Sequence, residues 1–436
     1  MSHCDEKYFH CNSRYAGLAL AVSWLKREKL FRFLNHLRLD LKTVKRTPRS
    51  KLEDLLVCVM AGVGSLRQID ESVRKDQGLA LALGRESLAD QSLISQTLDA
   101  FEEKSLAKLR SNLTGFLIQE SHCIGRIYRF RETILDLDMT DLPCSKRCEG
   151  ARKGRTTDKR GKTVRQLSLV YNHRYREPLD VFLHDGNVPS AGPLEQIVEY
   201  LEDCYGWDRP LRRQILWRLD AGYGSDRKLS WLMRRGYRVV AKGYSHQRAA
   251  RLAAQVEERD WKRVGPTQDV FEHPRLRSIT SPHRCLLVRT QRSKIAGYRY
   301  SYVISNLKKW VRPQTHIAFY NQRQGMEKEV QQIKSVLGLK HKRKRSFDGM
   351  QALALLTLIA NLQLVWFRRE LGVTELGIKR FIEEVLKIPG KVSFSSSGIE
   401  ITLEPQFKYY QLLNDWKPQR RLPLFPVQSG GMLYKI

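Results

Sequence analysis

The chain has 436 residues, which is enough for two or three domains, and its 42% hydrophobic content argues against a disordered protein. Lysine and arginine number 77 against 46 aspartates and glutamates, so the formal net charge is +31 and the pI is near 10.0. Such a charge attracts polyanions, and a nucleic acid that neutralised it would release counterions. The composition favours a nucleic-acid-binding protein, with a ribosome-associated protein or simple solubility as alternatives.

The cysteines do not form the dense framework of a small secreted domain. They are Cys4, Cys11, Cys58, Cys123, Cys144, Cys148, Cys204 and Cys285. Zinc is an unfavoured alternative, because neither the Cys144–Cys148 pair nor the cluster of His3, Cys4, His10 and Cys11 supplies four well-placed ligands. No signal peptide is visible, and the longest apolar run, 352–367, is short for a membrane span. We expect a buried helix there, no membrane partner, and a bacterial cytoplasmic location at the nucleoid.

Residues 1–125 predict a helical domain. Helical periodicity covers 16–37, 51–63, 68–83 and 91–118, with Asp90 or Ser92 as the cap of the last helix. A basic linker around Pro48 is either a solvated loop or an arm that contacts phosphates. Its cations are Lys42, Lys45, Arg46, Arg49 and Lys51.

From about residue 130 the pattern changes to short alternating apolar runs, which predict strands. Strands are expected at 134–138, 164–171, 179–183, 214–220 and 237–241, and helices at 192–205 and 226–235. The basic, glycine-containing segment 150–162 predicts a mobile loop. Three strands, then helix, strand, helix and strand is the ribonuclease-H-like order, so we expect an α/β fold with a mixed five-stranded sheet and flanking helices.

The expected catalytic domain covers 130–370. A β-rich insertion at about 250–310, with strands at 285–290 and 298–304, interrupts it before two closing helices at 321–336 and 346–369. The remaining region, 371–436, contains strands at 391–394 and 400–403 and a proline-rich end. We give it no function beyond a possible role in dimerisation.

Acidic residues at predicted strand ends stand out in so basic a chain. Asp136 and Asp138 are two apart on one strand and share a face, Asp220 ends another strand, and Glu327 lies on a charged helix. Two divalent ions about 3.5–4 Å apart can serve the attacking and leaving oxygens of a phosphodiester, and Mg²⁺ prefers carboxylate ligands. Taken singly, each residue also has an ordinary explanation. The aspartates can form turns, with Asp220 in an Asx-turn before Gly222, and the glutamate can be a solvated charge.

Taken together, these segments resemble the DDE transposases of bacterial insertion sequences, in the cut-and-paste group with a Tyr-Arg-Glu-Lys signature. That signature has spacings of two, three and six residues, and here it is met by Tyr320, Arg323, Glu327 and Lys334. The flanks agree over about 130–370. They are Leu135-Asp-Leu-Asp-Met-Thr140, His184-Asp-Gly-Asn-Val-Pro-Ser190, Leu219-Asp-Ala-Gly-Tyr-Gly-Ser225, Lys340–Phe347 and, more loosely, Asp90-Gln-Ser-Leu-Ile-Ser-Gln-Thr97.

The resemblance implies that Asp138, Asp220 and Glu327 are the catalytic, metal-binding triad for two Mg²⁺ ions, with Mn²⁺ as a substitute. It implies that Tyr320, Arg323 and Lys334 bind DNA near the cleaved end, the two cations as phosphate clamps. A helix over 321–336 would place the signature residues on one face. Asp136 stays open as an alternative first ligand. Trp261 and Trp310 are candidates to stack on a flipped base at the insertion.

The resemblance also implies that the helical domain at residues 1–125 binds DNA ends. It further implies an enzyme that binds the terminal inverted repeats of its own element, cuts there and joins the freed 3′ end to target DNA as a synaptic homodimer. The alternatives are a non-catalytic DNA-binding protein derived from a transposase and a nuclease that does not join. The sequence fixes neither the repeats, the target preference, a hairpin intermediate nor the activity of this copy.

Overall fold

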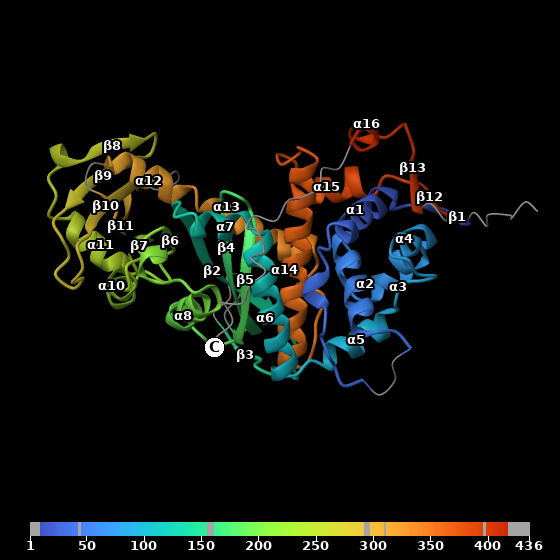
Figure 1. The fold of residues 1–436 in the computed structure, drawn as a ribbon. Helices are drawn as coiled ribbons and strands as arrows, with labels where there is room; N and C mark the ends of the chain where they lie inside the picture. The colour runs from blue at the N-terminus through green and yellow to red at the C-terminus, as the bar shows by residue number, and fades with distance from the viewer. Residues whose placement is uncertain are drawn as a thin grey trace, which may run out of the picture. The chain divides into compact units, whose positions relative to one another are not determined.

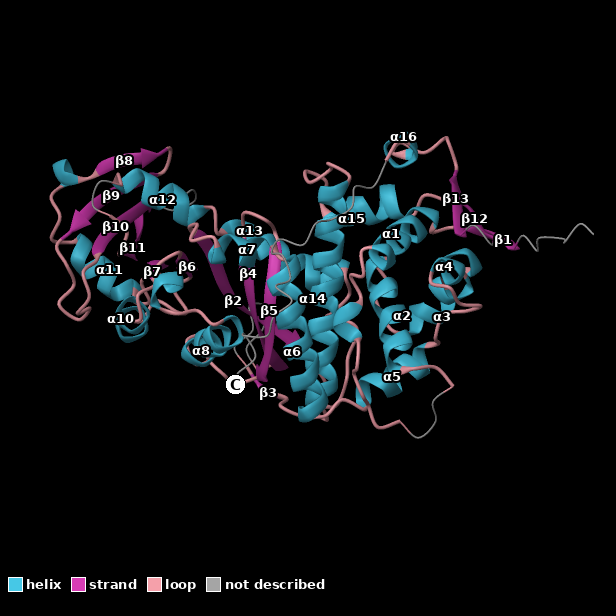
Figure 2. Ribbon diagram, in the orientation of Figure 1, coloured by secondary structure: helices cyan, strands magenta, loops and turns pink. Residues whose placement is uncertain are grey.

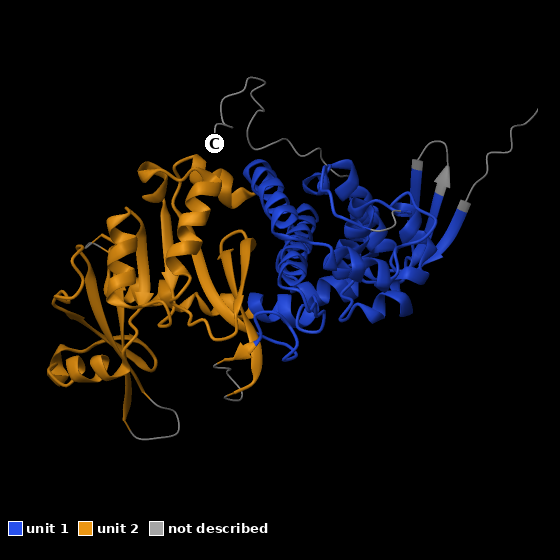
Figure 3. Cartoon of the chain, turned by 90° about the horizontal axis from the view of Figure 1, so that it is seen from below, with its two compact units in different colours: residues 1–120, 142–151, 329–436 blue, residues 121–141, 152–328 orange. Residues whose placement is uncertain are grey.

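The protein is described here by a computed structural model, which describes residues 9–41, 45–154, 161–291, 297–308, 311–395 and 398–416. The chain forms two compact units (Figure 3). The first contains residues 1–120, 142–151 and 329–436, and the second contains residues 121–141 and 152–328. Each unit is therefore built from segments that are far apart in the sequence.

The first unit is mostly helical (Figure 1). Its α-helices are α1 (Ala16–Arg27), α2 (Pro48–Met60), α3 (Arg67–Glu71), α4 (Gln77–Ala82), α5 (Gln91–Asp99), α6 (Glu103–Glu120), α14 (Phe347–Glu370), α15 (Ile378–Phe381) and α16 (Tyr410–Asn414). Short helical turns lie at η1 (Arg32–Leu34), η2 (Val73–Lys75), η4 (Gln332–Val336) and η5 (Ile382–Leu386). The predicted helices at 16–37, 68–83 and 91–118 are each divided in the structure. Asp90 caps α5, because its carboxylate accepts from the Leu93 amide at 2.8 Å.

Helix α14 is the centre of this unit, and α2, α5 and α6 pack against it. Aromatic pairs join it to the other helices, with ring centroids 5.4 Å apart for Trp24 and Phe367 and 5.7 Å apart for Phe116 and Trp366. Among the described residues it is the one helix long and apolar enough to cross a membrane, and its most apolar window is wholly buried. The prediction of a buried helix is therefore confirmed.

A small antiparallel sheet completes the unit, in the order β1-β12-β13. Strands β12 (Gly390–Ser395) and β13 (Gly398–Leu403) agree with the strands predicted in the tail, and β1 (Phe9–Ser13) was not predicted. The domain boundaries expected from the sequence stay a prediction. The contacts of α14 are with the amino-terminal helices, although the sequence analysis assigned it to the 130–370 segment.

The second unit is built on the large mixed sheet, drawn as magenta strands in Figure 2. Its strand order is β3-β4-β2-β6-β7-β11-β10-β9-β8, with β5 also paired to β4. The strands are β2 (Thr133–Pro143), β3 (Arg152–Lys153), β4 (Thr163–Asn172), β5 (Glu177–Asp185), β6 (Ile215–Leu219), β7 (Arg238–Lys242), β8 (Lys262–Gly265), β9 (Gln268–His273), β10 (Arg284–Gln291) and β11 (Tyr298–Ser305).

The prediction of a five-stranded sheet is wrong in the number of strands, because the sheet has ten. Strand β11 pairs antiparallel with β7, so the β-rich segment extends the same ten-stranded sheet instead of forming a separate piece. The five predicted strands all exist, and β2, β6 and β7 run parallel to one another. Of the expected loop 150–162, residues 152–153 form β3, and residues 155–160 lie outside the described residues.

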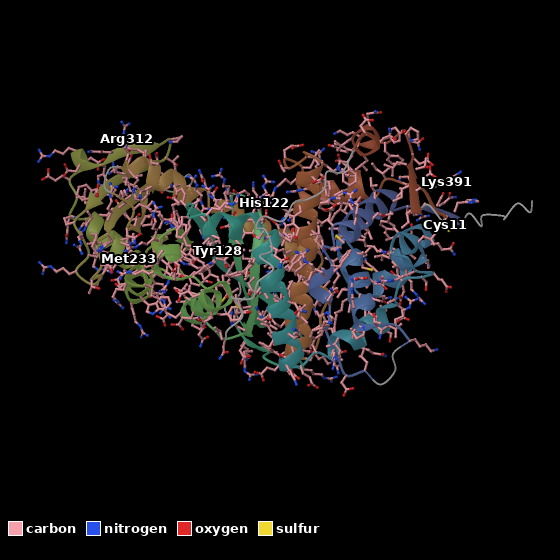
Figure 4. All side chains as sticks on the ribbon, in the orientation of Figure 1. Cys11, His122, Tyr128, Met233, Arg312 and Lys391 are labelled. Atoms are coloured by element: carbon pink, nitrogen blue, oxygen red, sulfur yellow. The ribbon has the colours of Figure 1, made fainter. Side chains whose placement is uncertain are left out.

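The helices of the second unit are α7 (His122–Tyr128), α8 (Leu194–Tyr205), α9 (Arg209–Arg212), α10 (Asp226–Arg234), α11 (His246–Ala253), α12 (Pro313–Asn321) and α13 (Gln324–Gln331), with a turn at η3 (Glu258–Asp260). Two of them, α8 and α10, agree with the helices predicted at 192–205 and 226–235. Helix α12 packs on the sheet, where its Ile317 joins a buried cluster with Leu216, Val240 and Leu286. Arg312, labelled in Figure 4, directly precedes this helix.

Candidate active site

Asp138 and Asp220 both lie just past the end of the parallel pairing between β2 and β6. Asp220 directly follows β6, whereas Asp138 lies within β2, which continues to Pro143, so the predicted strand 134–138 is too short. Leu137 of β2 is paired with Leu219 of β6, so the two aspartates are the next residues along their strands. Adjacent strands are about 4.8 Å apart, and residues in register project from the same face. The register therefore brings the two carboxylates together at one edge of the sheet.

The turn after Asp220 has the glycine-rich conformation expected from the sequence. The carboxylate of Asp220 accepts a hydrogen bond from the Gly222 amide at 2.9 Å, which is an Asx-turn. A Cβ at Gly224 would lie 1.9 Å from the carbonyl oxygen of Lys242, so only glycine fits there. The ordinary explanation for Asp220 is thus part of the structure. The Asx-turn uses the Oδ1 atom of Asp220, and Asp220 remains beside Asp138.

Arg323 lies directly against Asp138. Its Nη2 donates to Asp138 Oδ1 at 2.9 Å and to the carbonyl oxygen of Leu137 at 3.2 Å, and the arginine side chain is buried. Burial raises the pKa of Asp138, Arg323 opposes that shift, and the nearby charge of Asp220 adds to it. A carboxylate whose ionisation is disfavoured by burial and by a neighbouring carboxylate is one that a bound cation would stabilise.

Asp136 has different surroundings, although it is two residues away on the same strand. Asp136 and Arg218 are both fully buried, and the arginine donates from Nε and Nη2 to the two carboxylate oxygens, each at 2.7 Å. This bidentate pair uses both oxygens of Asp136. The geometry favours Asp138 over Asp136 as the first metal ligand.

The signature segment is not one helix, so the prediction of a single helix over 321–336 is wrong. Tyr320 lies in the last turn of α12, Arg323 lies in the turn at 322–323, and Glu327 lies in α13. The Arg323 amide donates to the Tyr320 carbonyl at 3.0 Å, an i→i−3 bond in place of the helical i→i−4 bond. Helical spacing across the signature therefore does not describe how its residues lie.

The structure brings Tyr320 and Arg323 to the two aspartates. Tyr320 is half-buried, and its pKa is raised to about 12 by burial first, with Asp220 and Asp138 adding to the shift and Arg323 opposing it. Glu327 is exposed, and within the described residues no group of three acidic, histidine or cysteine side chains is placed to hold a metal ion. The triad with Glu327 stays a prediction.

Lys334 lies in the π-helical segment η4, in the first compact unit. The unit that holds the aspartates ends at residue 328. The predicted contact of Lys334 with DNA beside Asp138 and Asp220 therefore also stays a prediction.

Two residues at this edge were not selected from the sequence. Tyr223 is fully buried, and its pKa is raised well above the usual range by burial and then by Asp138 and Asp220. Lys242 ends β7, the next parallel strand after β6, and burial and then Arg299 lower its pKa while Asp220 opposes the shift. A lysine at the end of a strand is a signal that sequence reading could have used.

The basic linker is largely engaged within the protein. Arg46 donates to the carbonyl of Ser87 at 2.7 Å, Arg49 pairs with Glu53 at 2.8 Å, and Lys51 is buried. These contacts, with Pro48 in the first turn of α2, do not favour a free phosphate-contacting arm. Lys42 lies outside the described residues.

The remaining candidates are the two tryptophans considered for base stacking and the cysteine and histidine clusters considered for zinc. Trp261 is covered by the guanidinium of Arg289, 4.8 Å from its ring centroid, and Trp310 lies outside the described residues. In the part of the chain that the structure describes, Cys144 and Cys148 form no disulfide and no candidate metal cluster occurs. His3 and Cys4 lie outside that part.

The profile of a known family matches nearly all of this chain. The family is described as Transposase DDE domain group 1, and the match covers residues 16–420. Two strand-end aspartates on a mixed α/β fold agree with that class of protein. The chain belongs to the family of transposases with a DDE domain.

One solved structure with similarity to the chain is described as a cryo-EM structure of the piggyBac transposase synaptic complex with hairpin DNA. It is 15% identical, with 85% of this chain and 76% of that chain covered and a TM-score of 0.42. No curated protein sequence matches the chain. Family membership therefore rests on the profile match.

Proposed function

We propose that this protein is a cut-and-paste transposase of a bacterial insertion sequence. It binds the terminal inverted repeats of its element, cuts the DNA there, and joins the freed 3′ hydroxyl to target DNA. The observation that carries the proposal is the pair of Asp138 and Asp220 directly after the last paired residues of parallel strands β2 and β6, in a chain of the DDE family. The order β5-β4-β2-β6-β7 supports a ribonuclease-H-like core.

The residues at this edge fit a divalent cation. Asp138 and Asp220 offer hard carboxylate oxygens, which Mg²⁺ prefers, with Mn²⁺ as a substitute. The charge of Asp220 helps to raise the pKa of Asp138, and a cation bound by both carboxylates would relieve that repulsion. Glu327 is proposed as the third ligand. Its exposed position on α13 leaves its carboxylate accessible.

When bound, two such ions would supply a deprotonated nucleophile and stabilise the leaving oxygen of an in-line displacement. The chain's own groups orient the phosphate. Arg323 and Lys334 are proposed to bind its oxygens, and Tyr320, held neutral by its raised pKa, remains a hydrogen-bond donor. Arg323 has to share its guanidinium between Asp138 and the phosphate.

The net charge of +31 supports DNA as the partner. A subunit has one pair of strand-end aspartates and an element has two ends, so we propose a synaptic homodimer. The proposed location is the bacterial cytoplasm, at the nucleoid.

The test is an incubation of the full-length protein with Mg²⁺ and DNA carrying the inverted repeats of its element. It is run beside Asp138→Asn, Asp220→Asn and Glu327→Gln variants, with Glu329→Gln as a charge-matched control on the same helix. We expect cleavage and joining in the parent and the control, and retained binding without cleavage in the three variants. Binding without metal-dependent cleavage in the parent contradicts the proposal and supports a DNA-binding protein derived from a transposase.

A further inference from the structure

The buried Arg218 connects its own strand, β6, to two other elements, β2 and α12. It lies on β6 opposite Asp136 of β2, where the two residues are register partners. Its third nitrogen, Nη1, donates to the carbonyl oxygen of Phe319 on α12 at 2.9 Å, and its guanidinium carbon lies 5.3 Å from the centroid of the Phe319 ring. The arginine thus joins both aspartate-bearing strands to the helix that precedes Arg323.

The Phe319 carbonyl is available because the helix breaks after it. In a continuous helix this oxygen would accept from the amide of residue 323. Here that amide donates to Tyr320 instead, at 3.0 Å. A buried carbonyl without a partner is costly, and the arginine replaces the missing helical donor. Arg218 therefore compensates for the break between α12 and α13.

The break has a direct consequence for the candidate site. It directs Arg323 to the strand end, where Nη2 meets both Asp138 and the Leu137 carbonyl. Two arginines, which bind aspartates two residues apart on β2, thus hold the same helix end to that strand. Arg218 binds at the Asp136 level, and Arg323 binds at the Asp138 level. Only the second level reaches the candidate metal ligands.

We propose that Arg218 is a positioning residue for this reaction: paired with Asp136, it fixes the turn between α12 and α13 and so holds Arg323 and the strand-end aspartates in working geometry. The inference rests on the proposed function, because it concerns the same site. The side-chain hydrogen bonds of Arg218 go to Asp136 and to the Phe319 carbonyl, so its effect on the proposed metal ligands is transmitted through the helix end and through Asp136.

The molecule contains a natural control at the other end of α12. Arg284 on β10 is also buried, binds both oxygens of Glu272 at 2.7 and 2.8 Å, and donates to the Val311 carbonyl at 2.5 Å, just before the helix begins. The two arginines share a bidentate carboxylate and one backbone carbonyl, although Glu272 is exposed and Nη1 of Arg284 also lies 3.0 Å from Nε2 of His316. They differ in which end of α12 they hold.

The experiment removes each pair as a whole, since removing one partner would leave a buried charge unpaired. The full-length double variants Asp136→Leu/Arg218→Met and Glu272→Leu/Arg284→Met are compared for Tm, binding of element-end DNA, and single-turnover cleavage in Mg²⁺. We expect the Arg218 pair variant to bind end DNA like the parent and to cleave about 100-fold more slowly, since small misplacements at a reacting centre have effects of this size. The Arg284 pair variant should cleave within about threefold of the parent, by the same reasoning.

Arg218→Lys keeps the charge beside Asp136 but has one nitrogen, which cannot serve both carboxylate oxygens and the Phe319 carbonyl. The Arg218→Lys variant should also cleave end DNA more slowly while still binding it. This variant tests the inference if the double variant does not fold. Equal cleavage by the parent, Arg218→Lys and the folded double variant overturns the inference while leaving the proposed function intact. An inactive parent overturns the proposed function itself.

Discussion

The strand ends and the signature segment contribute to one candidate site, and they are fixed to different degrees. Asp138 and Asp220 are set by a ladder in which each strand has neighbours on both sides. The segment from Tyr320 to Glu327 is anchored at α12 and passes through a break, and its glutamate is exposed. Paired strands specify positions through many hydrogen bonds, whereas a helix that restarts depends on a few tertiary contacts.

The largest effect should come from the strand ends. Asp138→Asn or Asp220→Asn should each slow metal-dependent end cleavage about a thousandfold or more, roughly 4 kcal/mol in transition-state free energy, because each removes a charged ligand. The measurement is single-turnover cleavage with saturating Mg²⁺. Asp180→Asn, at a buried aspartate elsewhere in the second unit, is the control and should cleave like the parent. A slow control would mean that the assay reports on folding.

Met326 tests how α13 is seated. It is fully buried, although the neighbouring Glu327 is exposed. Met326→Ala should lower the free energy of unfolding by about 2–5 kcal/mol, since it removes buried methylenes and leaves a cavity. Denaturant unfolding measures the change, and Lys328→Ala on the exposed side of the same helix should be within about 0.5 kcal/mol of the parent. A small effect for Met326 would show that α13 packs loosely.

His316 tests whether α12 is as firmly held as the sheet. Burial first, and Arg284 next, lower the pKa of His316 to about 4. Its unfolded pKa is about 6.5, so the unfolded chain binds the proton first, and stability should be lost as the pH falls from 6.5 to 4. The loss attributable to this residue is at most roughly 3 kcal/mol.

Unfolding of His316→Gln over that pH range should show a flatter decline than the parent. His246→Gln, at an exposed histidine, should follow the parent curve. Parallel curves for the parent and His316→Gln would contradict a buried neutral histidine under α12.

The smallest effect concerns the contact between α13 and the β4–β5 turn. A Cβ on Gly325 would lie 2.7 Å from Cε1 of the His173 ring, so Gly325→Ala requires the helix or the ring to move. We expect a net loss of about 1 kcal/mol in stability, because overpacking exceeds the gain in helix propensity. Gly325→Ala/His173→Ala should restore the parent's thermal stability. No restoration would mean that another contact limits the helix.

Sequence reasoning was strongest where a local pattern determines the structure. The alternating runs around Asp138 and Asp220 predicted strands β2 and β6, and the glycines after Asp220 predicted a tight turn. The apolar run that became α14 was also predicted as a buried helix, and α14 is that helix. Periodicity and turn chemistry lie within a few residues of one another, so a single chain displays them.

Features that depend on distant partners were not predictable in the same way. The extension of the sheet requires β11 to pair with β7, about sixty residues earlier, and nothing in either strand names its neighbour. At the helix break, Arg218, about a hundred residues earlier, donates to the Phe319 carbonyl in place of the missing helical amide. The choice between Asp136 and Asp138 also depended on that arginine, whose partner no spacing rule identifies.

The central claim is that Asp138 and Asp220 together hold a divalent cation. The most direct measurement is an electron paramagnetic resonance titration of the full-length protein with Mn²⁺, for the parent and for Asp138→Asn, Asp220→Asn and Glu329→Gln. The account predicts bound Mn²⁺ in the parent and in Glu329→Gln, with affinity reduced at least about tenfold, or roughly 1.4 kcal/mol, in both aspartate variants. Equal Mn²⁺ affinity in all four proteins would contradict it.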